Sequence, residues 1–222
     1  MKKNEERVNV SGGIKESNGT TELVFILDRS GSMAGLEGDA VGGFNAMIEA
    51  QKKEGPAFVS TVFFNNKSVV IHDRAPISEV APLKREDYIP MGCTALLDAI
   101  GDAVKHIKRV HRYIRPEDVP EKTIFAITTD GMENASRKYT LKQIKAMIER
   151  ERECGWEFIF LAANIDAFSA AEGMGIDRLS TASFEASHEG VIGCFEEMSE
   201  RICSFRRRNS EPDNEKTKEN GR

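Results

Sequence analysis

Residues 23–32 read LVFILDRSGS, an apolar run followed at once by acidic and hydroxyl side chains. The run over residues 23–27 is short, unbroken and partly β-branched, which is typical of a strand buried on both faces. Similar runs occur at residues 124–127 and 158–161, and residues 57–64 have a strand pattern too. The sequence therefore predicts a sheet whose central strands lie inside the molecule.

Helical patterns lie between these predicted strands. Apolar side chains recur every three or four residues in three stretches, residues 94–110, 141–148 and 191–205. Gly155 is placed to end the second of these helices. A further helix is predicted over residues 39–53, although Gly42 and Gly43 weaken the pattern there.

The segment 57–72 has the pattern of a β-hairpin, with two strand-like stretches around Asn65 and Asn66. Asparagine tolerates the positive φ angles that tight hairpin turns require. Elsewhere strands alternate with helices, which indicates parallel pairing through helical crossovers. We therefore expect an α/β fold, a Rossmann-like three-layer sandwich. Its central sheet is mostly parallel with one antiparallel edge strand, and helices cover both faces.

Composition and charge bound the organisation of the chain. It has 222 residues, a net charge of −5 and no apolar run that could span a bilayer. The acidic balance disfavours nucleic acid as a partner. We expect a flexible N-terminal arm over residues 1–19, one domain over residues 20–205 and a disordered, charged tail over residues 206–222. Scattered cysteines and the lack of a secretory signal predict reduced thiols and a cytoplasmic protein.

Short oxygen-bearing side chains stand at the ends of three predicted elements. Asp28, Ser30 and Ser32 follow the first strand, Asp130 follows the strand at 124–127, and Thr94 precedes a helix. Because ligands bind at the carboxyl ends of the strands in open α/β sheets, we expect these side chains to converge. Each alone also fits a turn or a helix cap. Their joint placement favours a binding site.

The predicted ligand set contains only oxygen atoms, which suits a hard cation such as Mg²⁺, Mn²⁺ or Ca²⁺. Asp28 and Asp130 together balance a divalent charge, and the hydroxyls add coordination without adding charge. Gly31 lets the first loop bend closely around an ion. Since Mg²⁺ prefers six ligands, five side chains leave at least one position open.

Three motifs together resemble the metal-ion-dependent adhesion site of von Willebrand factor type A (VWA) domains: Asp28-x-Ser30-x-Ser32, Gly92-x-Thr94-Ala95-Leu96 and Thr128-Thr129-Asp130-Gly131. The resemblance covers about residues 20–205 and all five ligand positions are intact. It implies a central sheet with helices on both faces. It also implies that Asp28, Ser30, Ser32, Thr94 and Asp130 bind the metal, and that an Asp or Glu of a partner protein fills the open position.

A narrower resemblance comes from the segments 131–134 and 162–167. They are similar to standalone bacterial VWA proteins of the cytoplasm, some of which are associated with tellurium resistance or stress-response operons. The resemblance as a whole implies a protein-binding module with Mg²⁺ as its cofactor and no enzymatic activity.

Two alternatives stay open at this level. A divalent-metal hydrolase could polarise a phosphate ester, but only Arg29 is placed to assist such a reaction. The chain also lacks a Gly-Lys-Ser/Thr phosphate loop and a Gly-x-Ser-x-Gly elbow. The other alternative is a metal-free scaffold whose acidic edge serves only to cap helices.

Overall fold

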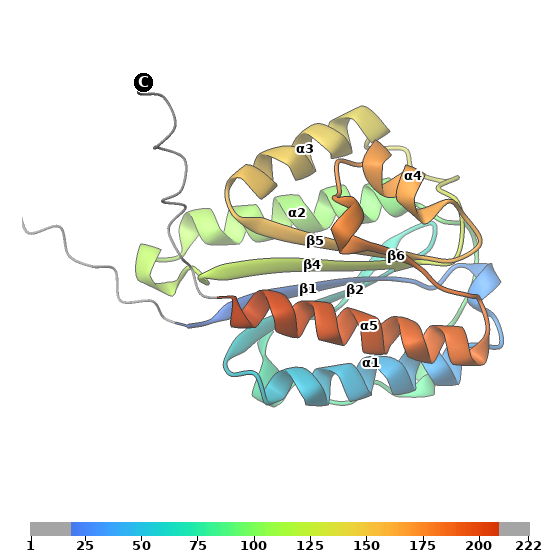
Figure 1. The fold of residues 1–222 in the computed structure, drawn as a ribbon, viewed down its shortest axis with the longest axis horizontal. Helices are drawn as coiled ribbons and strands as arrows, with labels where there is room; N and C mark the ends of the chain where they lie inside the picture. Colours follow the sequence, from blue (N-terminus) through green and yellow to red (C-terminus); the bar gives the residue numbers. More distant parts are fainter. Residues whose placement is uncertain (1–18, 209–222) are drawn as a thin grey trace, which may run out of the picture.

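The computed structural model describes residues 19–208, which form a six-stranded sheet between two layers of helices (Figure 1). The strand order is β3-β2-β1-β4-β5-β6, and only β2 and β3 pair antiparallel. The strands are β1 (Thr21–Asp28), β2 (Ala57–Phe64), β3 (Ser68–Pro76), β4 (Lys122–Thr129), β5 (Trp156–Ala162) and β6 (Thr181–Ser183). The predicted hairpin and its antiparallel edge strand are confirmed.

The helices divide between the two faces of the sheet (Figure 1). One face carries α1 (Glu37–Lys52) and α5 (His188–Arg207), and the other carries α2 (Leu96–Tyr113), α3 (Leu141–Glu153) and α4 (Ala167–Gly173). The predicted three-layer α/β sandwich is therefore confirmed. None of the helices in residues 19–208 is both long and apolar enough to cross a bilayer.

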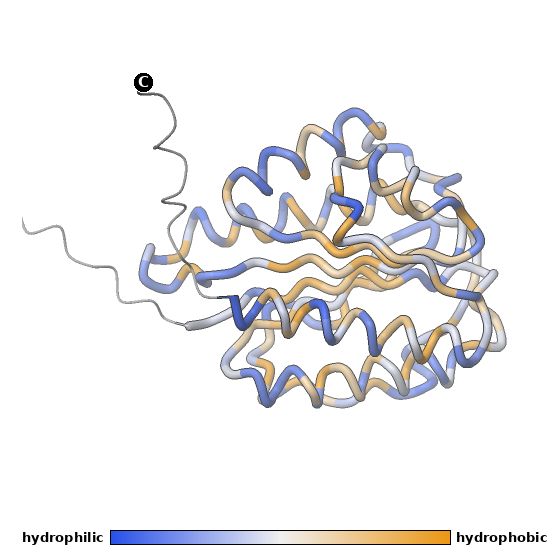
Figure 2. Tube along the Cα trace, in the orientation of Figure 1, coloured by the Kyte–Doolittle hydropathy of each residue, from blue (hydrophilic) through white to orange (hydrophobic). Residues whose placement is uncertain are grey.

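Strand β1 supplies side chains to two separate cores. Leu23, Phe25 and Leu27 pack on the side of α1 and α5, whereas Val24 and Ile26 pack on the side of α2 and α3. Apolar residues accordingly follow one another along the central strands, while polar residues mark the outer sides of the helices (Figure 2). This two-sided burial explains why the run 23–27 is unbroken rather than alternating.

The sheet topology brings three chain segments to one edge. Strand β1 lies between β2 and β4, and the register pairs Asp28 with Phe64 and Leu27 with Thr128. The carboxyl ends of these parallel strands therefore lie level with one another. The chain leaves β1 towards β2 on one side and later returns to β4 on the other, which is the kind of position where open α/β sheets bind ligands.

Glycines have distinct roles in the helical layers. Gly155 has φ +84° and follows the last turn of α3, as predicted. In α1, an added Cβ on Gly43 would lie 2.6 Å from the Phe195 ring of α5. The glycine that weakens the local helix pattern therefore allows α1 and α5 to approach closely.

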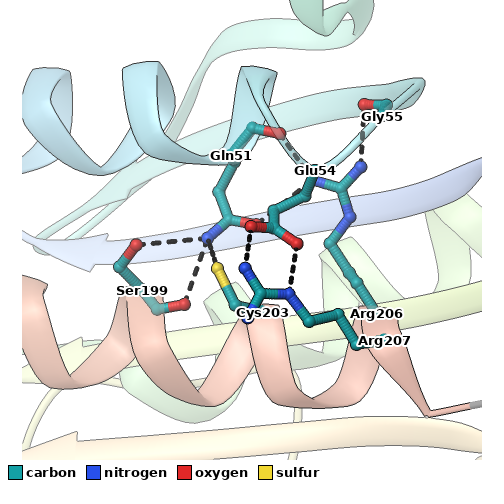
Figure 3. A network of polar contacts seen from close by, with 7 residues as sticks. All are labelled: Gln51, Glu54, Gly55, Ser199, Cys203, Arg206 and Arg207. Carbon is teal, nitrogen blue, oxygen red and sulfur yellow. Dashed lines mark hydrogen bonds and ion pairs between the residues drawn. The ribbon is translucent and has the colours of Figure 1, made fainter.

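The end of α5 is tied to the end of α1 by a polar network (Figure 3). The Arg206 guanidinium donates to the carbonyls of Gln51 and Gly55, each at 2.8 Å. The Arg207 Nε donates to Glu54 at 2.7 Å. These contacts join the last turn of α5 to the C-terminal end of α1 and to the residues that follow it.

Some boundaries differ from the prediction. Helix α1 begins at Glu37, two residues before the predicted start. Helix α5 continues to Arg207, so the first two residues of the predicted tail are helical. Neither β6 nor α4 was predicted, since both are short. Residues 1–18 and 209–222, which hold most of the predicted arm and tail, lie outside the described residues. All four cysteines are free thiols.

Candidate metal centre

The five predicted ligands come from three loops at the carboxyl edge of the sheet. Asp28 is the last residue of β1, and Asp130 directly follows β4. Both carboxylates are 2% exposed, Ser30 and Thr94 are similarly buried, and Ser32 is exposed. The structure thus places acidic and hydroxyl groups in a largely buried setting with Ser32 at the surface.

The oxygens of the first and third loops lie close together. The Ser30 and Ser32 hydroxyl oxygens are 3.0 Å apart. The Ser32 hydroxyl donates to Asp130 Oδ1 at 2.7 Å, and the Ser30 hydroxyl does so at 3.4 Å. Ligands about 2.1 Å from an octahedral Mg²⁺ have neighbouring oxygens about 3 Å apart, so this spacing fits such an ion.

Asp130 carries an unsatisfied oxygen. Its Oδ2 atom is buried and has no hydrogen-bond partner. Moreover, no Lys, Arg or His side chain in residues 19–208 forms an ion pair with Asp28 or Asp130. Two buried carboxylates without a cation are costly, because burial disfavours charge unless it is paired or bound to a metal. The donor set therefore fits a divalent cation.

Asp28 is fixed by two hydrogen bonds on its carboxylate. Ser30 N–H donates to Oδ1 at 2.7 Å and the Thr129 hydroxyl donates to Oδ2 at 2.6 Å. Burial raises the pKa of Asp28 above its ordinary value, the two hydrogen bonds partly offset this, and the negative Asp130 adds to the rise. A bound cation would act in the opposite direction and favour the ionised form.

The segment 88–92 runs alongside the first loop. The Tyr88 hydroxyl donates to the Asp28 carbonyl, Met91 N–H donates to the Arg29 carbonyl at 3.0 Å, and Gly31 N–H donates to the Gly92 carbonyl at 3.0 Å. Gly92 has φ +75°, and a Cβ there would lie 2.0 Å from the Asn66 side chain. The first two loops of the candidate site are thus held together by their backbones.

Thr94 is positioned from both sides by Asn134. Thr94 N–H donates to Asn134 Oδ1 at 2.9 Å, and Asn134 N–H donates to the Thr94 carbonyl at 3.0 Å. The N-cap position of α2 belongs to Ala95, so Thr94 is not the N-cap residue of this helix. A Cβ added to Gly131 would lie 3.6 Å from the Thr94 hydroxyl oxygen and 3.9 Å from the Ser32 hydroxyl oxygen.

The third loop is braced by groups outside the predicted ligand set. Asn164 donates to the Asp130 carbonyl at 3.1 Å. Glu133 accepts from Leu97 N–H at 2.9 Å and so satisfies the start of α2. Asp166, which follows β5, caps α4 by accepting from Ser169 N–H at 3.0 Å.

The supporting residues that were not predicted from the sequence include Tyr88, Thr129 and Asn134. Thr129 stands beside Asp130 in the motif, and this adjacency was the one available signal. Tyr88 and Asn134 reach partners 60 and 40 residues away, so no local pattern could have indicated them.

The chemistry of the cluster is narrow. Within residues 19–208, no group of three or more His, Cys, Asp or Glu side chains could hold a metal, which disfavours a site built on soft or nitrogen ligands. No His, Lys or Arg side chain in this part of the chain is hydrogen-bonded to the five ligands. The five side chains offer only oxygen donors, the kind of ligand that a hard cation prefers.

No protein-family model and no curated protein matches the sequence of this chain. Solved structures do match. One is the vWF domain of the type V pili tip protein Mfa5 from Porphyromonas gingivalis, with a TM-score of 0.64 at 9% identity. The match covers 87% of this chain and 98% of that domain. The SpRpn10 VWA domain gives a TM-score of 0.55 at 10% identity, covering 80% of this chain and 94% of that one.

Longer proteins also contain this fold. The PilB minor pilin from Streptococcus sanguinis matches with a TM-score of 0.65 at 14% identity, covering 87% of this chain and 63% of the pilin. Proximal thread matrix protein 1 from the mussel byssus, solved with a zinc-occupied MIDAS motif, matches at 0.58 and 16% identity. That match covers 83% of this chain and 46% of the mussel protein. At such low identity these matches show the fold, which is that of a VWA domain.

Proposed function

We propose that this protein is a metal-dependent protein-binding module. Asp28, Ser30, Ser32, Thr94 and Asp130 hold Mg²⁺, and an Asp or Glu of a partner protein completes the coordination. The observation that carries the proposal is the buried, unpartnered Oδ2 of Asp130 beside two hydroxyls and a second buried carboxylate. The zinc-occupied MIDAS motif of the mussel protein, which has the same fold, supports a divalent ion.

The charges explain why an acidic group would bind. The two aspartates balance a divalent cation, while the hydroxyls of Ser30, Ser32 and Thr94 add no charge. The ion therefore stays electrophilic enough to attract a further carboxylate into an open position. Mn²⁺ and Ca²⁺ take the same kind of oxygen ligand, and Mg²⁺ is favoured by the close spacing of the ligand oxygens.

A binding role accounts for the site better than hydrolysis. The metal supplies a Lewis acid in either case, but hydrolysis also needs a positioned base or a group that stabilises the leaving oxygen. The described ligands have hydroxyl, carboxylate and backbone neighbours instead. We further propose a cytoplasmic location and a role like that of standalone bacterial VWA proteins, including those associated with tellurium resistance.

The first test concerns the ion. Isothermal titration of Mg²⁺ into the full chain should give one site, and Asp28→Ala should abolish it. Asp118→Ala is the matched control, because this exposed carboxylate pairs with Arg115 at the surface. Equal Mg²⁺ binding by wild type and Asp28→Ala would overturn the assignment of the site.

The second test concerns the partner. A protein captured by the wild type in Mg²⁺ and lost by Asp28→Ala is purified, and its binding isotherm is measured with and without EDTA. We expect EDTA to abolish binding and Mg²⁺ to restore it. Thr94→Ala should weaken the partner more than the metal, since both aspartates remain. An affinity that is the same in EDTA and in Thr94→Ala would refute the proposed function.

A further inference from the structure

Exposed apolar side chains gather around the candidate metal centre. Large apolar side chains on a protein surface carry information when they cluster. Ile89, Met91 and Met132 are 55%, 56% and 71% exposed. Met91 precedes Thr94 by three residues and Met132 follows Asp130 by two. None of these three side chains is among the predicted metal ligands, so metal binding does not explain why they lie at this position.

The backbone contacts place these side chains beside the ligands. Ile89 follows Tyr88, whose hydroxyl donates to the Asp28 carbonyl, and Met91 N–H donates to the Arg29 carbonyl. On the other side, Gly131 faces the hydroxyls of Ser32 and Thr94. Met132 comes next, before Asn134 binds the Thr94 backbone. The apolar side chains thus occupy the two segments that flank the first metal loop.

Arg29 adds a positive charge to the same surface. It lies between the ligands Asp28 and Ser30 and is half-buried. Its buried Nε has no hydrogen-bond partner, and its guanidinium forms no ion pair with another described residue. An unpaired guanidinium beside a metal ion favours an anionic ligand over a neutral or basic one.

We propose that the partner presents an acidic residue flanked by large apolar side chains. The acidic residue binds the metal, and its apolar neighbours pack on a collar formed by Arg29, Ile89, Met91 and Met132. This inference rests on the proposed function and adds the chemistry of the partner. Methionine suits the task, because its flexible thioether adapts to apolar groups of different shape. The collar also keeps water from the metal–carboxylate contact, as the rim of a binding site does.

The test is a peptide selection on the full chain. Phage-displayed random peptides with a fixed central glutamate are selected in Mg²⁺ and eluted with EDTA. We expect Leu, Ile, Phe and Met to be enriched beside the glutamate. The double variant Met91→Ser, Met132→Ser should lose that enrichment and still yield peptides that EDTA elutes. The matched control is Tyr113→Ser, which removes an equally exposed apolar side chain from the end of α2 remote from the metal.

Affinities of single peptides give the size of the effect. For a selected peptide the double variant should bind about tenfold more weakly than wild type, a loss of about 1.4 kcal/mol. Tyr113→Ser should bind equally well. Circular dichroism confirms that each variant is folded, and Mg²⁺ titration confirms that the double variant keeps its metal.

The outcomes separate this inference from the proposed function. EDTA-eluted peptides with polar or unselected residues beside the glutamate would overturn the collar and leave the metal–carboxylate proposal standing. If no peptide elutes with EDTA, both fail. A Mg²⁺-dependent dimer of the full chain in ultracentrifugation, lost in the double variant, would also overturn the inference by showing that the collar packs against a second copy.

Discussion

Two adjacent glycines in α1 should respond in opposite directions to the same substitution. A Cβ added at Gly42 meets no atom within 4 Å, whereas a Cβ at Gly43 would lie 2.6 Å from the Phe195 ring and 3.0 Å from its Cβ. Phe195 is 5% exposed in the core between α5 and the sheet. We therefore expect Gly42→Ala to stabilise the protein and Gly43→Ala to destabilise it.

The magnitudes follow from two terms. Replacing glycine by alanine inside a helix gains about 0.8–1.0 kcal/mol, and this gain applies to both positions. Overpacking a well-packed core costs about 1–3 kcal/mol, and this cost applies only to Gly43. Because the helix term cancels, the difference between the two variants isolates the clash at about 1–3 kcal/mol.

Urea unfolding followed by circular dichroism measures both free energies, and equal m-values would show that the unfolded states are comparable. A double-mutant cycle sharpens the result: in a Phe195→Ala background most of the cost of Gly43→Ala should disappear, because the ring atoms at 2.6 and 2.9 Å are gone and only the Cβ at 3.0 Å remains. If Gly43→Ala is as stable as Gly42→Ala in the wild-type background, close contact between α1 and α5 is not what this glycine provides.

Three further predictions concern the metal, the last helix and pH. Mg²⁺ at 100 times its Kd should stabilise the fold by about 2.7 kcal/mol and raise Tm by several degrees in scanning fluorimetry. Asp28→Ala should show no shift, and equal shifts would place the ion elsewhere. Truncation to residues 1–194 should unfold the chain by circular dichroism, because it removes three buried side chains of α5, each stabilising by about 1.5–3 kcal/mol; a soluble, cooperatively unfolding fragment would contradict this. His188 Nδ1 lies 2.5 Å from Asp39, whose hydrogen bond and charge raise the histidine pKa above 6.5. The pair should therefore stabilise the fold fully below the unfolded pKa and cease to do so as pH rises through the folded one. His188→Gln should thus lose more stability relative to wild type at about pH 5.5 than at pH 8, and a pH-independent difference would show that the pair does not form.

The central sheet was predictable because its signal is local. The run 23–27 is apolar at every position, short and partly β-branched, which is typical of a strand buried on both faces. By contrast, β6 has three residues, Thr181–Ser183, without an apolar run. It exists because the free edge of β5 offers backbone partners, from Phe160 to Ala162, and a sequence window does not contain that edge.

The candidate site also has a part that the sequence predicts and a part that it does not predict. Asp28, Ser30, Ser32, Thr94 and Asp130 stand at the ends of predicted elements, so topology alone predicted that they meet. Their supports come from elsewhere in the chain. Tyr88 reaches the Asp28 carbonyl from a loop with no regular pattern, and Asn134 pairs with Thr94 through backbone and side chain at once. Such contacts depend on how loops cross, which periodicity does not encode.

The contacts between the end of α5 and the start of β4 determine where the described chain begins and ends relative to the candidate metal site. Lys122 starts β4, pairs in register with Thr21 at the start of β1, and donates to the carbonyls of Phe205 and Arg206 at 3.0 and 2.7 Å. The first strand thus starts where the last helix ends, at the left of Figure 1 and at the edge of the sheet remote from Asp130.

An anchor attached at residue 19 or at residue 208 would therefore hold the described domain by the side opposite the candidate metal site. A surface-coupled layer of such domains would present that candidate site outward. A linker that joins residue 208 to residue 19 would likewise permit new termini to be opened elsewhere without crossing the edge that carries Asp130.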